Sequence, residues 1–260
     1  MQLQLFQIDA FASEVFRGNP AAVCPLDEWL PDATMQQIAA ENNLSETAFF
    51  VKEGDGYALR WFTPGCEVDL CGHATLATSY VIFNYLEQTA ESIKFTSKSG
   101  LLEVTRAGEL LVLDFPANPP AVIAAPEFLS EGLGCAPLEV WRAGDFIVAL
   151  LAQESEVRQL TPDFALLRKV AGREVVATAP GDEVAFVSRM FAPKLEINED
   201  PVTGAAHCVL TPFWAARLGQ TKLYARQISA RGGDLFCELA GERVKIGGRA
   251  VAYLRGTIEI

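Results

Sequence analysis

The stretch RWFTPGCEVDLCGHATLA, residues 60–77, has a second version later in the chain, RMFAPKLEINEDPVTGAAHCVL, residues 189–210. Both open with an arginine followed at fixed spacings by phenylalanine, proline and glutamate: Arg60, Phe62, Pro64 and Glu67, then Arg189, Phe191, Pro193 and Glu196. The second copy begins 129 residues after the first in a chain of 260. A repeat at half the chain length predicts two copies of one folding unit.

The composition is that of an ordinary globular protein, because half of the residues are hydrophobic and 21% are charged. The net charge is −12, and lysine and arginine are not clustered. This argues against binding to nucleic acid or to an anionic membrane surface, since both need concentrated positive charge. A small anionic substrate is not excluded, because backbone amides at a helix start can bind a carboxylate.

The chain shows neither a signal peptide nor an apolar run of membrane-spanning length. Its six cysteines are scattered and lack the paired spacings of zinc sites. We therefore expect free thiols, no metal ion and a cytoplasmic location.

Period-two patterns and frequent turn signals predict that strands dominate both halves. In the first half we expect a helix with Asp32 as its N-cap and a second helix over residues 72–86. The expected strands there are residues 2–11, 20–26, 46–52, 57–63, 92–98, 101–107 and 110–116.

The second half repeats this order, with a short helical stretch over residues 163–170 and a long helix over residues 203–218. Pro212 should kink or restart the long helix. The expected strands are residues 138–143, 146–152, 174–179, 183–191, 222–229, 235–240, 243–248 and 250–260.

These patterns predict an α+β fold of two pseudo-symmetric lobes, residues 1–118 and 119–260, joined through the proline-rich segment 116–128. The last strand is expected to cross back to the first lobe. In each lobe a curled, barrel-like sheet should wrap around one central helix. The apolar stripes of these two helices are Leu76, Tyr80 and Phe83, then Leu210, Phe213 and Trp214.

Each long helix begins at a glycine, Gly72 in the first half and Gly204 in the second. Amides at a helix start lack intrahelical partners and carry partial positive charge, and glycine lets a ligand approach them closely. Two such starts facing each other across a cleft could hold a carboxylate. The alternative is that both are ordinary helix caps without a ligand.

Three titratable residues stand near these helix starts. His73 falls in the first turn of the first helix, where we expect a neutral imidazole. Asp200 precedes the second helix and could also serve as its cap or dipole partner. Glu46 opens an apolar strand, where we expect it to be partly buried; a solvated Glu at a strand end is the alternative.

The sequence resembles the phenazine-biosynthesis PhzF-type isomerase family, which shares its fold with diaminopimelate epimerase. The resemblance covers about 250 residues. It is carried by five segments in order, QIDAFASEVFRGNPAAV, NLSETAFF, RWFTPGCEVDLCGHATLA, EDPVTGAAHCVLTPFWAARLG and QISARGGDLFCEL.

The resemblance implies a cofactor-independent isomerase with its active site in the cleft between two lobes, and it makes a homodimer plausible. It implies that Glu46 is the acid/base, assisted by His73 and Asp200. Gly72 and Gly204 would offer amides to the carboxylate of a small substrate. The other implied lining residues are Ser45, Asn19, Ser229 and Cys71.

The related epimerases use two cysteines, one at each helix start. Cys71 stands at the first place, whereas the second place is expected to fall at Pro201, and Cys208 lies a turn into the helix. A one-sided shuttle by Glu46 therefore fits better than two-thiol epimerisation. Two alternatives stay open: a racemase or epimerase that depends on Cys71, and a binding protein that has lost the chemistry.

Overall fold

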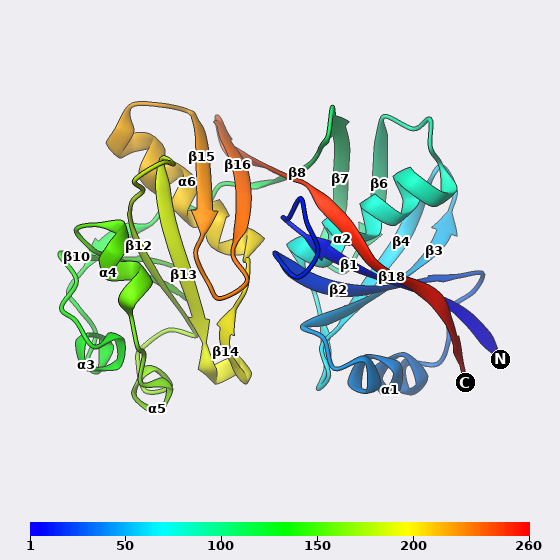
Figure 1. Cartoon of the computed structure of the whole chain (residues 1–260), viewed down its shortest axis with the longest axis horizontal. Helices are drawn as coiled ribbons and strands as arrows, with labels where there is room; N and C mark the ends of the chain where they lie inside the picture. The colour runs from blue at the N-terminus through cyan, green and yellow to red at the C-terminus, as the bar shows by residue number, and fades with distance from the viewer. The chain divides into compact units, whose positions relative to one another are not determined.

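The computed structural model describes residues 1–260, which form two compact units (Figure 1). Unit 1 comprises Met1–Asp114 together with Gly247–Ile260, and unit 2 comprises Phe115–Ile246. The end of the chain belongs to unit 1 because its last strand pairs with its first. The fold is mixed, with mostly sheet and few helices, as the sequence predicts.

Unit 1 carries two α-helices and a π-helical turn on a set of strands. In chain order these elements are β1 (Gln2–Ala10), β2 (Asn19–Leu26), α1 (Asp32–Asn42), β3 (Glu46–Glu53), β4 (Gly56–Phe62), β5 (Glu67–Val68), α2 (Gly72–Val81), η1 (Ile82–Leu86), β6 (Ser92–Ser97), β7 (Gly100–Ala107), β8 (Leu110–Pro116) and β18 (Ala250–Glu259).

Unit 2 adds three short helices that the sequence patterns indicate only in part. Its elements are β9 (Ala121–Ile123), α3 (Leu129–Leu133), β10 (Glu139–Ala143), β11 (Phe146–Leu150), α4 (Glu154–Gln159), α5 (Phe164–Leu167), β12 (Glu174–Pro180), β13 (Phe186–Ala192), the 3-10 turn η2 (Pro193–Leu195), β14 (Ile197–Asp200), α6 (Gly204–Leu218), β15 (Lys222–Gln227), β16 (Gly233–Ala240) and β17 (Arg243–Gly248).

The two units have the same strand topology. In unit 1, β1–β2, β3–β4, β4–β5 and β6–β7 pair antiparallel, whereas β2–β3 and β4–β6 pair parallel. In unit 2, β10–β11, β12–β13, β13–β14 and β15–β16 pair antiparallel, whereas β11–β12 and β13–β15 pair parallel. The strands β1 to β7 of unit 1 therefore correspond in their pairing to β10 to β16 of unit 2, as the sequence repeat predicts.

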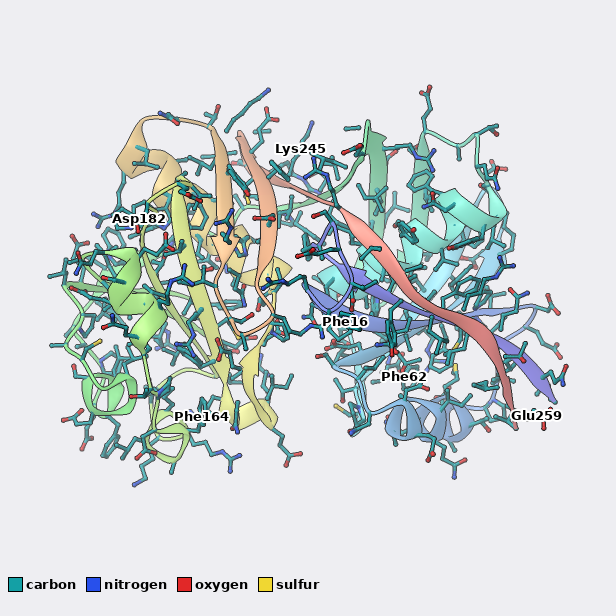
Figure 2. All side chains as sticks on the ribbon, viewed as in Figure 1. Phe16, Phe62, Phe164, Asp182, Lys245 and Glu259 are labelled. Atoms are coloured by element: carbon teal, nitrogen blue, oxygen red, sulfur yellow. The ribbon has the colours of Figure 1, made fainter.

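The repeated arginine motif has one structural role in both units. Arg60 makes a bidentate ion pair with Glu67 and stacks over the ring of Phe62, which is labelled in Figure 2. Arg189 likewise makes a bidentate pair with a glutamate and stacks over Phe191. Its partner is Glu199 rather than Glu196 of the repeated pattern, since Glu196 adopts a left-handed conformation that ends η2.

Helix α2 is buried on almost every side rather than along one stripe, because it contacts β1, β2, β3 and β18. Leu76 and Phe83 are buried as expected, whereas Tyr80 is half-buried. The hydroxyls of Thr75, Thr78 and Ser79 donate to carbonyls one turn earlier, at 2.6, 2.7 and 2.8 Å. These bonds satisfy polar groups that could not otherwise be buried around a central helix.

Helix α6 runs from Gly204 to Leu218 without a break, so the expected restart at Pro212 is wrong. Proline lacks the N–H that would bond the carbonyl four residues earlier, which belongs to Cys208. That carbonyl instead accepts from the backbone N–H of Asn118 at 3.0 Å. A backbone partner from outside the helix therefore offsets the loss of the intrahelical bond.

The remaining corrections concern element ends and short elements. Asp32 is the first helical residue of α1 rather than its N-cap, which is Pro31. The predicted stretch over residues 163–170 is the four-residue α5, and α3 and α4 were missed. The strands β5, β9 and β14 are only two to four residues long, too short to show a period-two pattern. No helix is both long enough and apolar enough to cross a membrane.

Candidate active site

Glu46 and His73 form a close, buried pair in unit 1. Glu46 opens β3 and His73 is the second residue of α2, and α2 packs on β3. Their side chains approach to 3.0 Å between His73 Nε2 and Glu46 Oε2. Both residues are less than a tenth exposed, and neither atom has a hydrogen-bond partner, so the contact is an ion pair that is not aligned as a hydrogen bond. Glu46 is therefore buried, as expected, and the alternative of a solvated Glu at a strand end is wrong.

Asn19 contacts the other nitrogen of the same imidazole. It opens β2, is fully buried, and its Nδ2 lies 3.2 Å from His73 Nδ1. The amide nitrogen can donate to a neutral ring, and after a half turn of the amide its oxygen can accept from a protonated one. The preceding Gly18 has φ +64°, and a Cβ there would lie 2.0 Å from the carbonyl oxygen of Ala10. Glycine is therefore required for the turn that delivers Asn19.

Cys71 completes the cluster. It is the N-cap residue of α2 and is buried, with its Sγ 3.4 Å from His73 Nδ1. Burial, together with the charge of Glu46, raises the pKa of the Cys71 thiol to about 11. The thiol is therefore protonated at neutral pH, against the alternative in which Cys71 acts as a thiolate base.

His73 differs from the neutral imidazole expected at a helix start. Burial lowers the pKa of His73, but Cys71 and Glu46 outweigh this effect, so its pKa lies well above the usual value. The negative charge of the nearby Glu46 carboxylate outweighs the positive end of the α2 dipole at this ring. We therefore take the imidazolium as the neutral-pH form.

The same three residues are the ones that could hold a metal ion. One ligand atom each from Glu46, Cys71 and His73 lie within 4.8 Å of one another. Carboxylate, thiolate and imidazole are ligands of zinc, although a metal would have to displace the protons of Cys71 and His73. That the protein works without a metal remains a prediction.

Asp200 forms the centre of a second cluster, in unit 2. It is the last residue of β14, is buried, and its Oδ2 accepts from the hydroxyl of Thr203, the N-cap residue of α6. Buried Gln227 fixes both residues: its Nε2 donates to the Asp200 carbonyl at 2.7 Å, and its Oε1 accepts from the Thr203 N–H at 2.9 Å. Gln227 was missed in the sequence, where it is one polar residue of a strand.

The other predicted lining residues differ in their surroundings, and only Ser229 has a structural role that its hydrogen bonds explain. The hydroxyl of Ser229 donates to the carbonyl of Pro201 at 2.8 Å and accepts from the N–H of Gly232, so it closes a turn beside Asp200. Ser45 is half-buried immediately before Glu46. Gly72 and Gly204 are the first helical residues of α2 and α6, as predicted.

Cys71 and Thr203 are the N-cap residues of the two long helices, and Pro201 lies two residues before Thr203. That the position of the second thiol falls at Pro201 stays a prediction. Cys208 is buried one turn into α6, where its Sγ faces the Gly204 carbonyl at 3.7 Å, as the sequence predicts.

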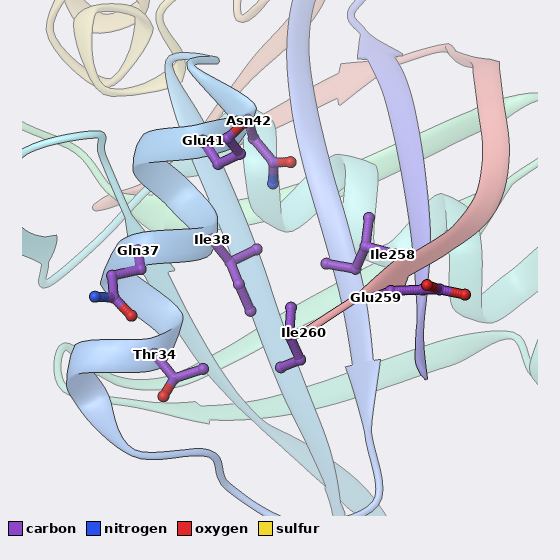
Figure 3. A pocket seen from close by; sticks show the side chains of 8 residues that line it. All are labelled: Thr34, Gln37, Ile38, Glu41, Asn42, Ile258, Glu259 and Ile260. Carbon is purple, nitrogen blue, oxygen red and sulfur yellow. The ribbon is translucent and has the colours of Figure 1, made fainter. Parts of the chain in front are cut away.

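A pocket of about 450 Å³ lies elsewhere in unit 1, between α1 and the end of β18 (Figure 3). Figure 3 shows Ile38 of α1 directed toward Ile258 and Ile260. None of its lining residues belongs to the Glu46 cluster. We therefore assign no chemistry to this pocket.

Comparison with known proteins identifies the family. A family model described as phenazine biosynthesis-like protein matches residues 8–256. An uncharacterized isomerase from Pseudomonas aeruginosa is 51% identical over 260 residues, which cover all of both chains. The chain belongs to the PhzF family.

Solved structures agree with this membership. The crystal structure of a PhzF family protein from Enterococcus faecalis has a TM-score of 0.98 and 52% identity, with 100% of both chains covered. A hydroxyproline epimerase from Agrobacterium vitis, solved with bound trans-4-hydroxy-L-proline, has a TM-score of 0.62 and 14% identity, covering 99% of this chain and 92% of that one. This second likeness concerns the fold alone. The diaminopimelate epimerase-like fold is thus confirmed, and the PhzF family membership supports an isomerase.

Proposed function

We propose that this PhzF family protein is a cofactor-independent isomerase that moves a proton on a small carboxylate-bearing substrate, with Glu46 as the proton shuttle. The observation that carries the proposal is the buried contact between Glu46 and His73, in which one oxygen and one nitrogen face each other without hydrogen-bond partners. Buried polar atoms in that state are few in native structures, and each calls for an explanation. The PhzF family resemblance assigns the acid/base role to the same glutamate.

In the proposed reaction, the Glu46 carboxylate takes a proton from a carbon activated by conjugation or by an adjacent carboxylate. The electron pair of the broken C–H bond moves into the substrate π-system. Glu46 then returns the proton to another carbon, which shifts a double bond, or to the same carbon, which exchanges its hydrogen. General acid/base catalysis of this kind contributes roughly 10²–10⁴-fold to a rate.

The imidazolium of His73 faces the carboxylate of Glu46, which receives the substrate proton. Once Glu46 is neutral, the remaining positive charge of His73 favours the anionic intermediate. His73 itself is held by Asn19 at 3.2 Å and by the Cys71 thiol at 3.4 Å. We assign Asp200 to the same reaction on the PhzF family resemblance, and the helix-start amides near Gly72 and Gly204 to binding of the substrate carboxylate.

The test is deuterium incorporation at carbon in D₂O, followed by proton NMR. Two probe acids separate the reaction types: vinylacetate for a double-bond shift and trans-4-hydroxy-L-proline for exchange at a stereocentre. We expect at least one probe to gain deuterium with the wild-type protein and to lose this exchange with Glu46→Gln. Exchange that survives Glu46→Gln would remove Glu46 from the mechanism. Binding of both probes without exchange would favour the binding-protein alternative.

A further inference from the structure

Glu46, Cys71 and His73 form a buried set of three different ligand types. One ligand atom from each residue, a carboxylate oxygen, a sulfur and a ring nitrogen, lies within 4.8 Å of the other two. The three side chains come from the start of β3 and the start of α2, both in unit 1. The set is therefore complete within one unit.

Two atoms of this set are buried and make no hydrogen bond. Glu46 Oε2 and His73 Nε2 face each other at 3.0 Å without the alignment of a hydrogen bond. The exposed fractions of the two residues are only 9% and 5%. A buried polar atom without a hydrogen bond costs free energy, so both atoms call for an explanation. A cation between the oxygen and the nitrogen would engage both at once, after the ring has lost its Nε2 proton.

The spacing of the three ligand atoms suits zinc. Zinc binds nitrogen and oxygen at about 2.0–2.2 Å and thiolate sulfur at about 2.3 Å, so two ligands of a tetrahedral site lie about 3.5 Å apart. The 3.0 Å between Glu46 Oε2 and His73 Nε2 and the 4.8 Å limit of the whole set bracket that separation. Rotation of the Cys71 and Glu46 side chains can supply the remaining movement.

The ring of His73 is already oriented from its other side. Asn19 is fully buried, and its amide nitrogen lies 3.2 Å from His73 Nδ1. After a half turn of the amide, the Asn19 oxygen can accept the Nδ1 hydrogen, as the carbonyl oxygens behind metal-bound histidines do. This leaves Nε2, which faces Glu46, as the ligand nitrogen.

Zinc would leave the net charge of the buried set unchanged. Without the metal, the set holds a carboxylate, an imidazolium and a thiol, and its net charge is zero. On binding, His73 releases its Nε2 proton and Cys71 its thiol proton to water, so a carboxylate, a neutral ring and a thiolate surround a doubly charged cation. The net charge is again zero, so no uncompensated charge is buried. A metal ion takes the proton from a thiol that coordinates it, so Cys71 need not be ionised beforehand.

We propose that Glu46, Cys71 and His73 form an inhibitory site for a thiophilic divalent cation of the zinc type. Thiolate and imidazole ligands select zinc over magnesium and calcium, which prefer oxygen ligands. Zinc bound to Glu46 occupies the carboxylate that should receive the substrate proton, and the reaction therefore stops. The binding of the cation does not depend on the proposed function, whereas the inhibition rests on it.

The first test needs no turnover and uses Co²⁺ as a spectroscopic probe on the reduced full chain. Cobalt bound through Cys71 should give a sulfur-to-cobalt charge-transfer band in the near ultraviolet, which Zn²⁺ removes by displacement. Cys71→Ser should lose this band, and Glu46→Gln should weaken cobalt binding by roughly tenfold or more. Cys66→Ser removes an exposed thiol outside the set and should keep the band. No band in wild type, or a band that survives Cys71→Ser or disappears in Cys66→Ser, would overturn the site.

The second test follows deuterium exchange of the probe acids by chelator-treated wild type as Zn²⁺ is added. Exchange should fall at the Zn²⁺ concentration that displaces cobalt, return when EDTA is added, and be unaffected by the same concentration of Mg²⁺. Exchange that continues with the site filled, or that requires zinc, would contradict the inhibitory role. A cobalt band without any exchange in the zinc-free protein would remove the proposed function and keep the site, whereas exchange without a band would do the reverse.

Discussion

The Nε2 atom of His73 lies 3.0 Å from Oε2 of Glu46, and the second nitrogen of the same ring is 3.4 Å from the Cys71 sulfur. The imidazole is therefore held between a carboxylate and a thiol, both buried with it. A carboxylate at this distance favours the charged ring. The protonation state of His73 thus depends on Glu46.

The second histidine, His207, should behave in the opposite way. It is fully buried in α6, its Nδ1 lies 2.8 Å from the carbonyl of Thr203, and burial lowers the pKa of His207 to about 4. We expect a neutral ring with the hydrogen on Nδ1, which donates to that carbonyl. Long-range ¹⁵N–¹H NMR of the two histidines reads both states directly. Assignment by His207→Gln is the control, and a charged His207 at neutral pH would contradict the structure.

Cys71 should be unreactive despite its place at a helix start. Its raised pKa of about 11 leaves little thiolate at neutral pH, and the side chain is buried. Alkylation with iodoacetamide, followed by mass spectrometry, should modify the exposed Cys66 and spare Cys71. Cys66→Ser provides the matched control. Faster labelling of Cys71 than of Cys66 would revive the racemase alternative.

Gln227→Ala should destabilise unit 2, because Gln227 holds the turn between Asp200 and Thr203. The substitution leaves the Thr203 N–H and the Asp200 carbonyl without their present partner in a buried place. We expect a loss of about 2–4 kcal/mol in the free energy of unfolding, measured by urea denaturation. Ser229→Ala removes a less buried hydroxyl from the same turn and should cost about 1 kcal/mol. Equal effects of the two substitutions would argue against a special role of Gln227.

Glu174→Gln should change how stability depends on pH. Burial raises the pKa of Glu174 from 4.5 to about 7 in the folded protein. As pH rises, the unfolded chain therefore loses the proton of Glu174 at a lower pH than the folded protein does. Wild type should therefore lose stability between these two values, by up to about 3 kcal/mol, and keep this penalty at higher pH. Glu174→Gln should be more stable than wild type above pH 7 and equal to it at low pH. A difference that does not depend on pH would contradict this.

Most of the fold could be predicted from the sequence, because its long strands and both central helices carry strong local patterns. The predictions that were wrong concern positions whose structure depends on tertiary contacts. Glu199 replaces Glu196 as the partner of Arg189 because the intervening turn changes the direction of the chain. Asp32 lost its predicted capping role to the preceding Pro31, whose backbone already provides the turn into α1.

The candidate site was predictable in part. The PhzF family resemblance and the helix starts indicated Glu46, His73 and Asp200, and the structure brings the first two into contact. The charge of His73 was predicted wrongly, since the neighbouring carboxylate is 27 residues away along the chain. Gln227 carries no local signal, and only its hydrogen bond relates it to Asp200.

The coupling of Glu46 to His73 is tested most directly by the ¹⁵N-detected titration of His73 in wild type and in Glu46→Gln. We predict an imidazolium at neutral pH in wild type, and a pKa of His73 that is lower by at least about one unit in Glu46→Gln, because the carboxylate charge is gone. A neutral His73 in wild type, or the same titration midpoint in both proteins, would contradict the account.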